Sequence, residues 1–459
     1  MRSLLVSTYE MGRQPFGIAS AAAWMRAAGW DVTCLDVAKE ELQEGRLGSA
    51  DLIGFHLPMH TATRLAAPII ATARRMNPAA RICAFGLYAP LNADWLRSTG
   101  VDAVFGGEFE EDLTAFAHHV GTQRSQSTQR NTYAADSAFN RRPLPKIHFL
   151  VPDRSGLPPL SKYATLQMPD GRRRLVGYTE ASRGCRHLCR HCPVVPIYNG
   201  QFRVVQAEVV VADVDAQIAA GAEHITFGDP DFFNGPTHAM KIVTALNAKH
   251  PAVTYDVTIK VEHLLKHPDL LPRLADTGCA FVTSAIESVD DRVLALFDKG
   301  HTREDFVRAV ALCRASGLSL VPTFVAFHPW LTLASYCDLV DTIARLDLVD
   351  HVAPIQLAIR LLVPEGSRLL TLDEMRAHVG PFDPATLTYR WLHPDPDVDA
   401  LQRDVMALVG MRLTADRRAV FDTVSTLAHE RAGVERPMAD SRPARYRATV
   451  PYLNEPWYC

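Results

Sequence analysis

Three cysteines and two histidines share eight consecutive positions: Cys185, His187, Cys189, His191 and Cys192. The cysteines have the spacing C-x3-C-x2-C, and thiolates and imidazoles both bind transition metals. Nine cysteines in 459 residues are too few for a disulfide scaffold, and clustered thiols in a reducing compartment more often hold metal. The array therefore predicts a metal site.

Two kinds of metal site compete for this array. A structural zinc site needs four ligands, usually from two separated pairs, so His187 or His191 would have to complete it. A cubane 4Fe-4S cluster takes thiolates at its iron corners, and three thiolates leave one iron open for another ligand. The spacing, and its position after a predicted strand, favour a 4Fe-4S cluster on Cys185, Cys189 and Cys192, with zinc as the alternative.

The elements that must position the cysteines are short apolar runs that alternate with helical patterns over residues 161–370. Six units of strand followed by helix predict a partial (β/α)6 barrel of the TIM type. Such barrels work at the carboxyl ends of their strands. The cysteine array comes directly after the first strand of the series, so it should lie at that face.

An earlier series of five apolar runs fills residues 1–120 and also alternates with helical segments. Continuously apolar strands separated by helices indicate a doubly wound parallel sheet. Residues 121–160 are rich in Gln, Ser, Thr and then Pro, which is typical of a linker. Residues 371–459 carry two helical patterns and a tail. The predicted class is α/β, with a mainly helical C-terminal region.

Polar residues follow several of the barrel strands and alternate toward one face. Carboxylates and backbone carbonyls there suit an ammonium group, and an arginine fork suits a carboxylate. The candidates from the second to the sixth strand end are Gly228, Asp229, Asp231, Lys260, Glu262, Glu287, Ser288 and Arg360.

Charge and hydropathy exclude some classes of partner. The chain has 48 basic and 51 acidic residues, mixed along its length, so no global field attracts nucleic acid or a membrane surface. No apolar run approaches the roughly twenty residues of a membrane-spanning helix. These patterns predict a cytoplasmic protein without nucleic-acid or membrane partners. Composition alone names no substrate; the leading hypothesis is modification of a small molecule.

The cysteine motif resembles that of the radical S-adenosylmethionine (SAM) enzymes, although His191 stands where that family usually has an aromatic residue. The resemblance implies that the open iron chelates SAM, and that an external one-electron reductant such as flavodoxin or ferredoxin drives its cleavage to a 5′-deoxyadenosyl radical. It also implies that Gly228, Asp229 and Asp231 hold the amino group of SAM. The later strand-end residues would then contact its ribose or carboxylate.

The order of sheet domain, linker and cysteine array resembles the cobalamin-binding branch of that family. The resemblance implies that His56, Gly86, Gly107 and Glu108 line a cobalamin site, since glycine lets backbone approach a large ligand. With cobalamin bound, methyl transfer is the favoured reaction. The alternatives are a radical SAM enzyme whose first domain holds no corrin, and a zinc-stabilised binding protein without enzymatic activity.

The tail ends "PYLNEPWYC" at Cys459. A terminal thiol there could act catalytically at the barrel mouth, as a redox partner or soft ligand. The tail resembles those of a radical SAM group that ends Cys-Sec-Ala-Glu-Pro or Cys-Cys-Ala-Glu-Pro. We therefore expect a selenocysteine codon directly after Cys459, read as a stop. An in-frame UGA followed by Ala-Glu-Pro codons would support this, whereas UAA or UAG would end it.

Overall fold

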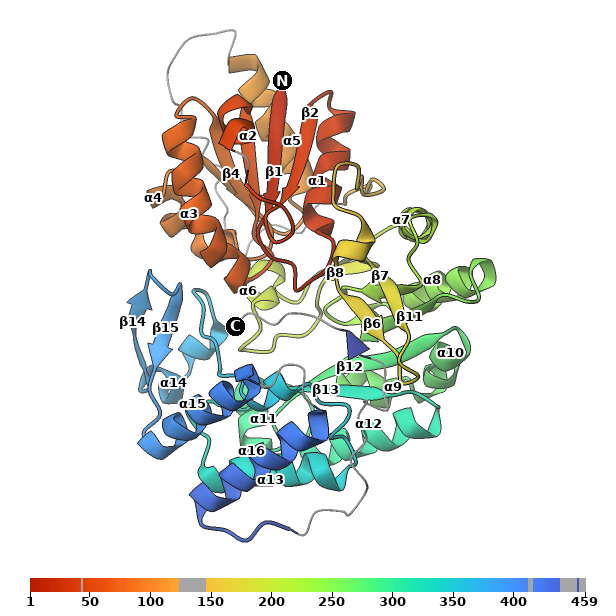
Figure 1. Cartoon of the computed structure of the whole chain (residues 1–459), viewed down its shortest axis with the longest axis vertical. Helices are drawn as coiled ribbons and strands as arrows, with labels where there is room; N and C mark the ends of the chain where they lie inside the picture. Colours follow the sequence, from red (N-terminus) through yellow and green to blue (C-terminus); the bar gives the residue numbers. More distant parts are fainter. Residues whose placement is uncertain (43, 124–145, 412–415, 438–451, 454–459) are drawn as a thin grey trace.

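A computed structural model describes residues 1–42, 44–123, 146–411, 416–437 and 452–453 (Figure 1). Most of the predicted linker and the predicted thiol at Cys459 lie outside these residues. The described part contains two large sheets, the first in the upper part of the view and the second nearer its middle, with helices packed around both.

The first sheet has five parallel strands in the order β2-β1-β3-β4-β5. Its strands are β1 (Arg2–Ser7), β2 (Asp31–Asp36), β3 (Leu52–His56), β4 (Arg81–Phe85) and β5 (Ala103–Phe105). Its helices are α1 (Phe16–Ala27), α2 (Glu44–Ser49), α3 (His60–Met76), η1 (Pro90–Asn92), α4 (Ala93–Ser98) and α5 (Glu110–Gln123).

The strands of this sheet are almost continuously apolar because both of their faces are buried. Two separate hydrophobic clusters form, one with Ile53 and Ile70 and the other with Leu5 and Ile18. A parallel sheet needs cover on both faces, and the crossover helices supply it. The prediction of a doubly wound first domain is confirmed.

The second sheet has seven strands in the order β13-β12-β11-β10-β7-β6-β16. Its first five members run parallel, and β6 and β16 join antiparallel at one edge. The strands are β6 (Thr165–Gln167), β7 (Arg173–Thr179), β10 (His224–Phe227), β11 (Thr254–Thr258), β12 (Cys279–Glu287), β13 (Leu320–Phe324) and β16 (Tyr452–Leu453).

Helices after each parallel strand make this sheet a curled partial barrel. They are α7 (Ala207–Ala219), η3 (Phe232–Asn234), α8 (Pro236–Lys249), α9 (Val261–Lys266), η4 (Pro268–Leu270), α10 (Leu271–Asp276), α11 (Asp291–Phe297), α12 (Arg303–Ala315) and α13 (Leu333–Arg345). Their apolar faces share one large core with the strands. The partial-barrel prediction is confirmed.

The sixth predicted strand is only a single parallel bridge between Phe327 and Arg360. Pro354 begins a 3-10 helix, η5 (Pro354–Leu357), in the apolar run that was expected to form this strand. Proline fixes its own φ and cannot donate to a sheet ladder, so the run curls before it can pair.

The C-terminal region contains α15 (Pro396–Met411) and α16 (Arg417–Ala432), as its periodicity predicts. Before them come η6 (Arg368–Thr371), α14 (Asp373–Arg376) and a hairpin of β14 (Val379–Asp383) and β15 (Thr388–Trp391) that the sequence did not predict. None of the described helices combines the length and the hydropathy needed to cross a membrane.

Candidate active site

The three array cysteines lie in one loop at the carboxyl end of the first barrel strand. This loop runs from β8 (Ser182–Gly184) through α6 (Val194–Tyr198) to β9 (Phe202–Val204), and β8 and β9 pair antiparallel. We call residues 185–192 the cysteine loop. It is anchored near both ends by hydrogen bonds to neighbouring elements.

One anchor of the cysteine loop is Asn234, which is fully buried in η3. Its Oδ1 accepts a hydrogen bond from the Arg186 amide at 3.2 Å, and its amide group donates to the Gly184 carbonyl at 3.4 Å. The other anchor is Arg190, whose guanidinium donates to the carbonyls of Ala295 and Leu296, both at 3.0 Å. The loop is therefore preorganised by neighbouring barrel elements.

The thiols of Cys185, Cys189 and Cys192 lie close enough to influence one another electrostatically. Burial, with a smaller contribution from the charge of Cys189, raises the pKa of Cys185 to about 11 and that of Cys192 to about 12. All three cysteines are free. Because burial makes the negative charge of these thiolates unfavourable, a cationic iron–sulfur cluster bound to them would stabilise their ionised forms. The three thiols therefore fit the predicted 4Fe-4S cluster.

His191, the unusual residue before the third cysteine, packs its ring against Phe297 with centroids 4.7 Å apart. Its Nε2 lies 3.1 Å from Glu287 Oε1, and Lys299 Nζ lies 3.4 Å from the same oxygen. Burial alone would raise the pKa of Glu287, but Lys299 and His191 lower it to about 2. Glu287 is thus an anion held beside the cysteine loop.

Gly228 and Asp229 follow β10, where the sequence placed them. A Cβ on Gly228 would lie 1.7 Å from the Tyr178 hydroxyl, so only glycine allows this approach. The Asp229 carboxylate accepts hydrogen bonds from the Ala181 amide at 2.9 Å and the Ser182 hydroxyl at 2.5 Å. Burial raises the pKa of Asp229 to about 7. Asp229 therefore braces the strand that leads into the cysteine loop.

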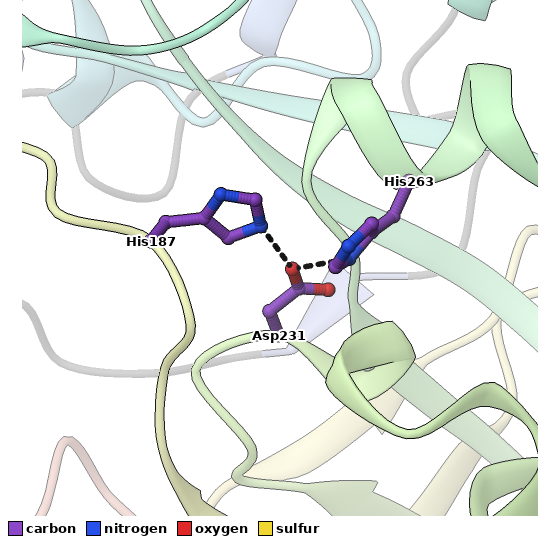
Figure 2. Close-up of side chains that lie close together, drawn as sticks. All are labelled: His187, Asp231 and His263. Carbon is purple, nitrogen blue, oxygen red and sulfur yellow. Dashed lines mark ion pairs between the residues drawn. The ribbon is translucent and has the colours of Figure 1, made fainter. Parts of the chain in front are cut away.

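Lys260 and Glu262 follow β11, and both reach the cysteine loop. Lys260 Nζ lies 2.9 Å from His187 Nδ1 and 3.3 Å from Glu262 Oε2. Asp231, from the end of β10, contacts His187 and His263 (Figure 2). The structure thus gathers these predicted residues around His187.

The remaining strand-end candidates have other partners. Arg360 Nη1 donates to Asp399 at 2.7 Å, and its guanidinium stacks 3.5 Å from the ring centroid of Trp391. Ser288 Oγ accepts from the Asp290 amide at 3.1 Å, next to the start of α11. Cofactor contacts of Arg360 and Ser288 stay predictions, because both side chains have local structural partners.

A cavity of about 280 Å³ lies where the carboxyl ends of the first sheet face the barrel. It brings the predicted residues His56, Gly86 and Gly107 together with Gly184 and Gly228 from the barrel side. Strand ends of two separate sheets therefore share one ligand-sized space beside the cysteine loop.

His56 is fixed in this cavity by Glu10, whose Oε1 lies 2.6 Å from His56 Nδ1. The ring also fills the space beside two glycines, because a Cβ on Gly17 would lie 2.2 Å from it and one on Gly86 would lie 2.9 Å from it. Glycine at positions 17 and 86 therefore leaves room for the His56 imidazole at the carboxyl end of the first sheet.

Glu108 is buried next to this cavity, and neither of its carboxylate oxygens has a hydrogen-bond partner among the described residues. Burial raises the pKa of Glu108 to about 7, against the smaller opposing effect of Arg183. A buried acid without partners is costly when ionised, so Glu108 takes up a proton readily.

Arg183 is the residue that sequence reasoning missed. Its guanidinium bonds Glu110 and Glu180, each at 2.7 Å, and lies over the rings of Phe109 and Phe149. Although burial lowers the pKa of Arg183, the two carboxylates raise it more. An arginine directly before the cysteine array was the available signal, but its partners lie far away in the sequence.

A second cavity, of about 240 Å³, occupies the barrel interior and adjoins the first through Met11, Arg13 and Gly228, which line both. Its wall carries Thr226, Thr258, Thr283, Thr323 and Asp256 from successive strands, with Arg417 and Tyr452 at the side. Phe227, Phe281 and Val321 also line this cavity, so its wall combines hydroxyl groups with apolar side chains.

Residues 179–343 match the sequence profile of the Radical SAM superfamily. The chain carries a radical SAM domain. The prediction of a radical SAM enzyme is confirmed at this level, and the domain implies a 4Fe-4S cluster and SAM as cofactors. The structure places the cysteine loop of this radical SAM domain at the carboxyl ends of the barrel strands, as the motif predicts.

Curated relatives match about a third of the chain. The chain is 24% identical over 172 residues to tRNA-2-methylthio-N(6)-dimethylallyladenosine synthase of Moorella thermoacetica, covering 36% of this chain and 38% of that protein. It is 26% identical over 160 residues to bacteriochlorophyllide d C-8(2)-methyltransferase of Chlorobaculum tepidum, covering 32% and 34%. The matches thus span little more than a third of these relatives.

Solved structures resemble the chain beyond the radical SAM domain. The cobalamin-dependent SAM radical enzyme OxsB, with aqua-cobalamin and SAM bound, superposes with a TM-score of 0.70 at 13% identity, covering 94% of this chain and 72% of that one. The radical SAM methyltransferase TsrM from Kitasatospora setae, with cobalamin and a [4Fe-4S] cluster bound, gives 0.57 at 18% identity, covering 75% and 70%. At these identities the likeness establishes the fold.

Proposed function

We propose that the protein is a cobalamin-dependent radical SAM enzyme that transfers a methyl group to a small molecule. The observation that carries this is the cavity between the two sheets, which joins His56, Gly86 and Gly107 to Gly184 and Gly228 beside the cysteine loop. A methyl carrier held there would lie between the first sheet and the SAM site.

Each cofactor has its own residues in this proposal. Cys185, Cys189 and Cys192 hold the cluster, which leaves one iron for SAM. The buried anion Glu287 and the cation Lys260 stand on neighbouring strand ends, where they can orient the charged groups of SAM. When bound, the cluster supplies an electron to SAM and the corrin supplies a transferable methyl group.

In this proposal the protein positions the cofactors and the substrate and keeps water away from them. Arg183 and its two carboxylates join the first sheet to the β8 strand, which holds the cavity walls together and limits water entry. The substrate occupies the threonine-lined lumen, on the far side of Met11 and Arg13. A flavodoxin- or ferredoxin-like protein delivers the electron.

The test is anaerobic purification of the full chain after expression with hydroxocobalamin. We expect about four irons per chain and near-stoichiometric corrin, and release of 5′-deoxyadenosine or S-adenosylhomocysteine when reductant and SAM are added. Substitution of Cys185, Cys189 or Cys192 by Ala should abolish the iron absorbance and leave corrin in place. A full iron complement without corrin would contradict the proposal.

A second candidate is a radical SAM enzyme whose first domain holds no corrin. The packing of His56 favours it, because the ring nitrogen Nε2, which Glu10 leaves open, lies against Gly17, only 2.2 Å from where a Cβ would stand. The same experiment separates the two candidates: this one gives the cluster and 5′-deoxyadenosine but no bound corrin.

A further inference from the structure

A histidine–aspartate–histidine cluster lies beside the cysteine loop (Figure 2). Its members come from three separate elements: His187 from the cysteine loop, Asp231 from the end of β10 and His263 from α9. Asp231 Oδ2 lies 2.7 Å from His263 Nδ1 and 3.4 Å from His187 Nε2. One ligand atom from each residue lies within 4.8 Å of the others.

These three atoms are buried, and none has a hydrogen-bond partner of acceptable geometry among the described residues. Asp231 is 1% exposed and His263 is 6% exposed. The 2.7 Å contact is an ion pair that does not meet hydrogen-bond geometry. Buried polar atoms are almost always hydrogen-bonded, so three converging atoms that share only ion-pair contacts indicate a place for a common partner.

The other carboxylate oxygen of Asp231 is already used. Oδ1 accepts from the Phe233 amide at 3.2 Å and from the Lys260 amide at 3.4 Å. These two bonds fix the orientation of the carboxylate and leave Oδ2 directed at the two imidazoles. The cluster is therefore held rigidly from the Asp231 side.

We propose that His187, Asp231 and His263 bind a first-row divalent metal ion such as Zn²⁺, separate from the iron–sulfur cluster. Two imidazoles and one carboxylate are a common ligand set for Zn²⁺ and Fe²⁺ sites with open positions. Bonds of about 2.0 to 2.2 Å to each ligand need only small movements of the side chains. The ion would tie the cysteine loop to the ends of β10 and β11.

Two charged neighbours of His187 should affect metal binding in opposite directions. Binding through Nε2 requires a proton on Nδ1, which Glu262 Oε2, 3.5 Å away, is placed to accept. A carboxylate that accepts from a ligating histidine is a usual partner in metal sites. Lys260 Nζ, 2.9 Å from the same Nδ1, is an ammonium that opposes both this proton and a nearby cation.

Zinc and iron counts on the anaerobically reconstituted full chain test the site, after incubation with Zn²⁺ alone and removal of loosely bound metal. We expect about one zinc per chain in addition to the cluster iron. His263→Ala and Asp231→Asn should each weaken zinc binding by roughly tenfold or more, an effect of at least about 1.4 kcal/mol. His267→Ala, one turn further along at the end of α9, is the matched control and should bind zinc normally.

Lys260→Met should strengthen zinc binding, and this variant keeps the proposal testable if the ligand variants fold poorly. Absence of zinc from the wild-type protein would overturn the site. So would zinc that survives His263→Ala but is lost when the three array cysteines are replaced, because the ion would then occupy the cysteine loop. Neither outcome depends on whether the protein binds cobalamin.

Discussion

Glu108 shows how much a single buried carboxyl can affect stability. Its pKa is raised from 4.5 to about 7, so between these values the folded state binds a proton that the unfolded state has lost. Stability therefore falls as pH rises from about 4.5 to 7, and the cost is fully present above pH 7.

Glu108→Gln should remove this cost. We expect the variant to unfold with the wild-type free energy at pH 4.5 and to be more stable at pH 8, by up to roughly 3 kcal/mol. Urea unfolding of the cofactor-free protein at several pH values measures the difference. Parallel pH profiles for the two proteins would mean that folding does not shift the pKa of Glu108.

At the scale of the residue, the cysteine array could be recognised because its spacing is local. Lys260 and Glu262 were expected to alternate along one strand, but β11 ends at Thr258 and Glu262 lies in α9, so the turn into this helix brings both residues to His187. His263 and Arg183 could not be predicted as site residues, since their partners come from other elements. The separation of His187 and His263 in the sequence does not predict that they lie together. Both reach Asp231 only because the cysteine loop and α9 stand at neighbouring strand ends.

At the scale of the element, the start of α1 controls the position of His56. A Cβ at Gly17 would lie 2.2 Å from the His56 ring, which is itself held between Glu10 and the aromatic rings of Phe85 and Phe109. Helix and imidazole can coexist here only because residue 17 has no side chain.

Gly17→Ala should therefore displace the ring and lower the free energy of unfolding by about 1 to 3 kcal/mol, the usual cost of overpacking. Corrin binding should weaken with it, while the iron content stays unchanged. Gly48→Ala in α2 is the matched control, because its Cβ would meet nothing within 4 Å. Equal stability of the two variants would show that His56 moves without cost.

Helices and strands could be predicted from the sequence where the apolar runs and helical periods are long. The five strands of the first sheet lie in the five apolar runs that predicted them. The β14–β15 hairpin was missed because Gly380 and Pro381 sit inside β14, and both residues argue against a strand. A two-residue strand such as β16 carries too little pattern to be recognised.

At the scale of the whole molecule, the Arg183 guanidinium links the two sheets. It neutralises Glu110, which is fully buried at the start of α5, and Glu180 at the end of the first barrel strand. Removing one partner from a buried ion pair leaves a charge without compensation, which costs about 3 to 5 kcal/mol.

Arg183→Met should accordingly destabilise the protein by about that amount. It should also let the first sheet and the barrel unfold in separate transitions, seen as two steps in calorimetry or urea unfolding. Adding Glu110→Gln to Arg183→Met should recover part of the loss, because one stranded carboxylate is removed. A single transition with unchanged midpoint in Arg183→Met would contradict this role.

The pairing of β16 with β6 has a consequence for synthesis of the chain. Tyr452 pairs with Gln167, and Leu453 with Leu166, so the edge of the barrel sheet is completed by residues made about 285 positions later in the chain. At ribosomal rates of roughly 5 to 20 residues per second, β6 waits on the order of tens of seconds for its partner. During that interval its unpaired backbone can template association with other nascent chains. Slow translation between these two segments, or scarce chaperone, should therefore lower the yield of folded protein more than the stability of the finished fold would suggest.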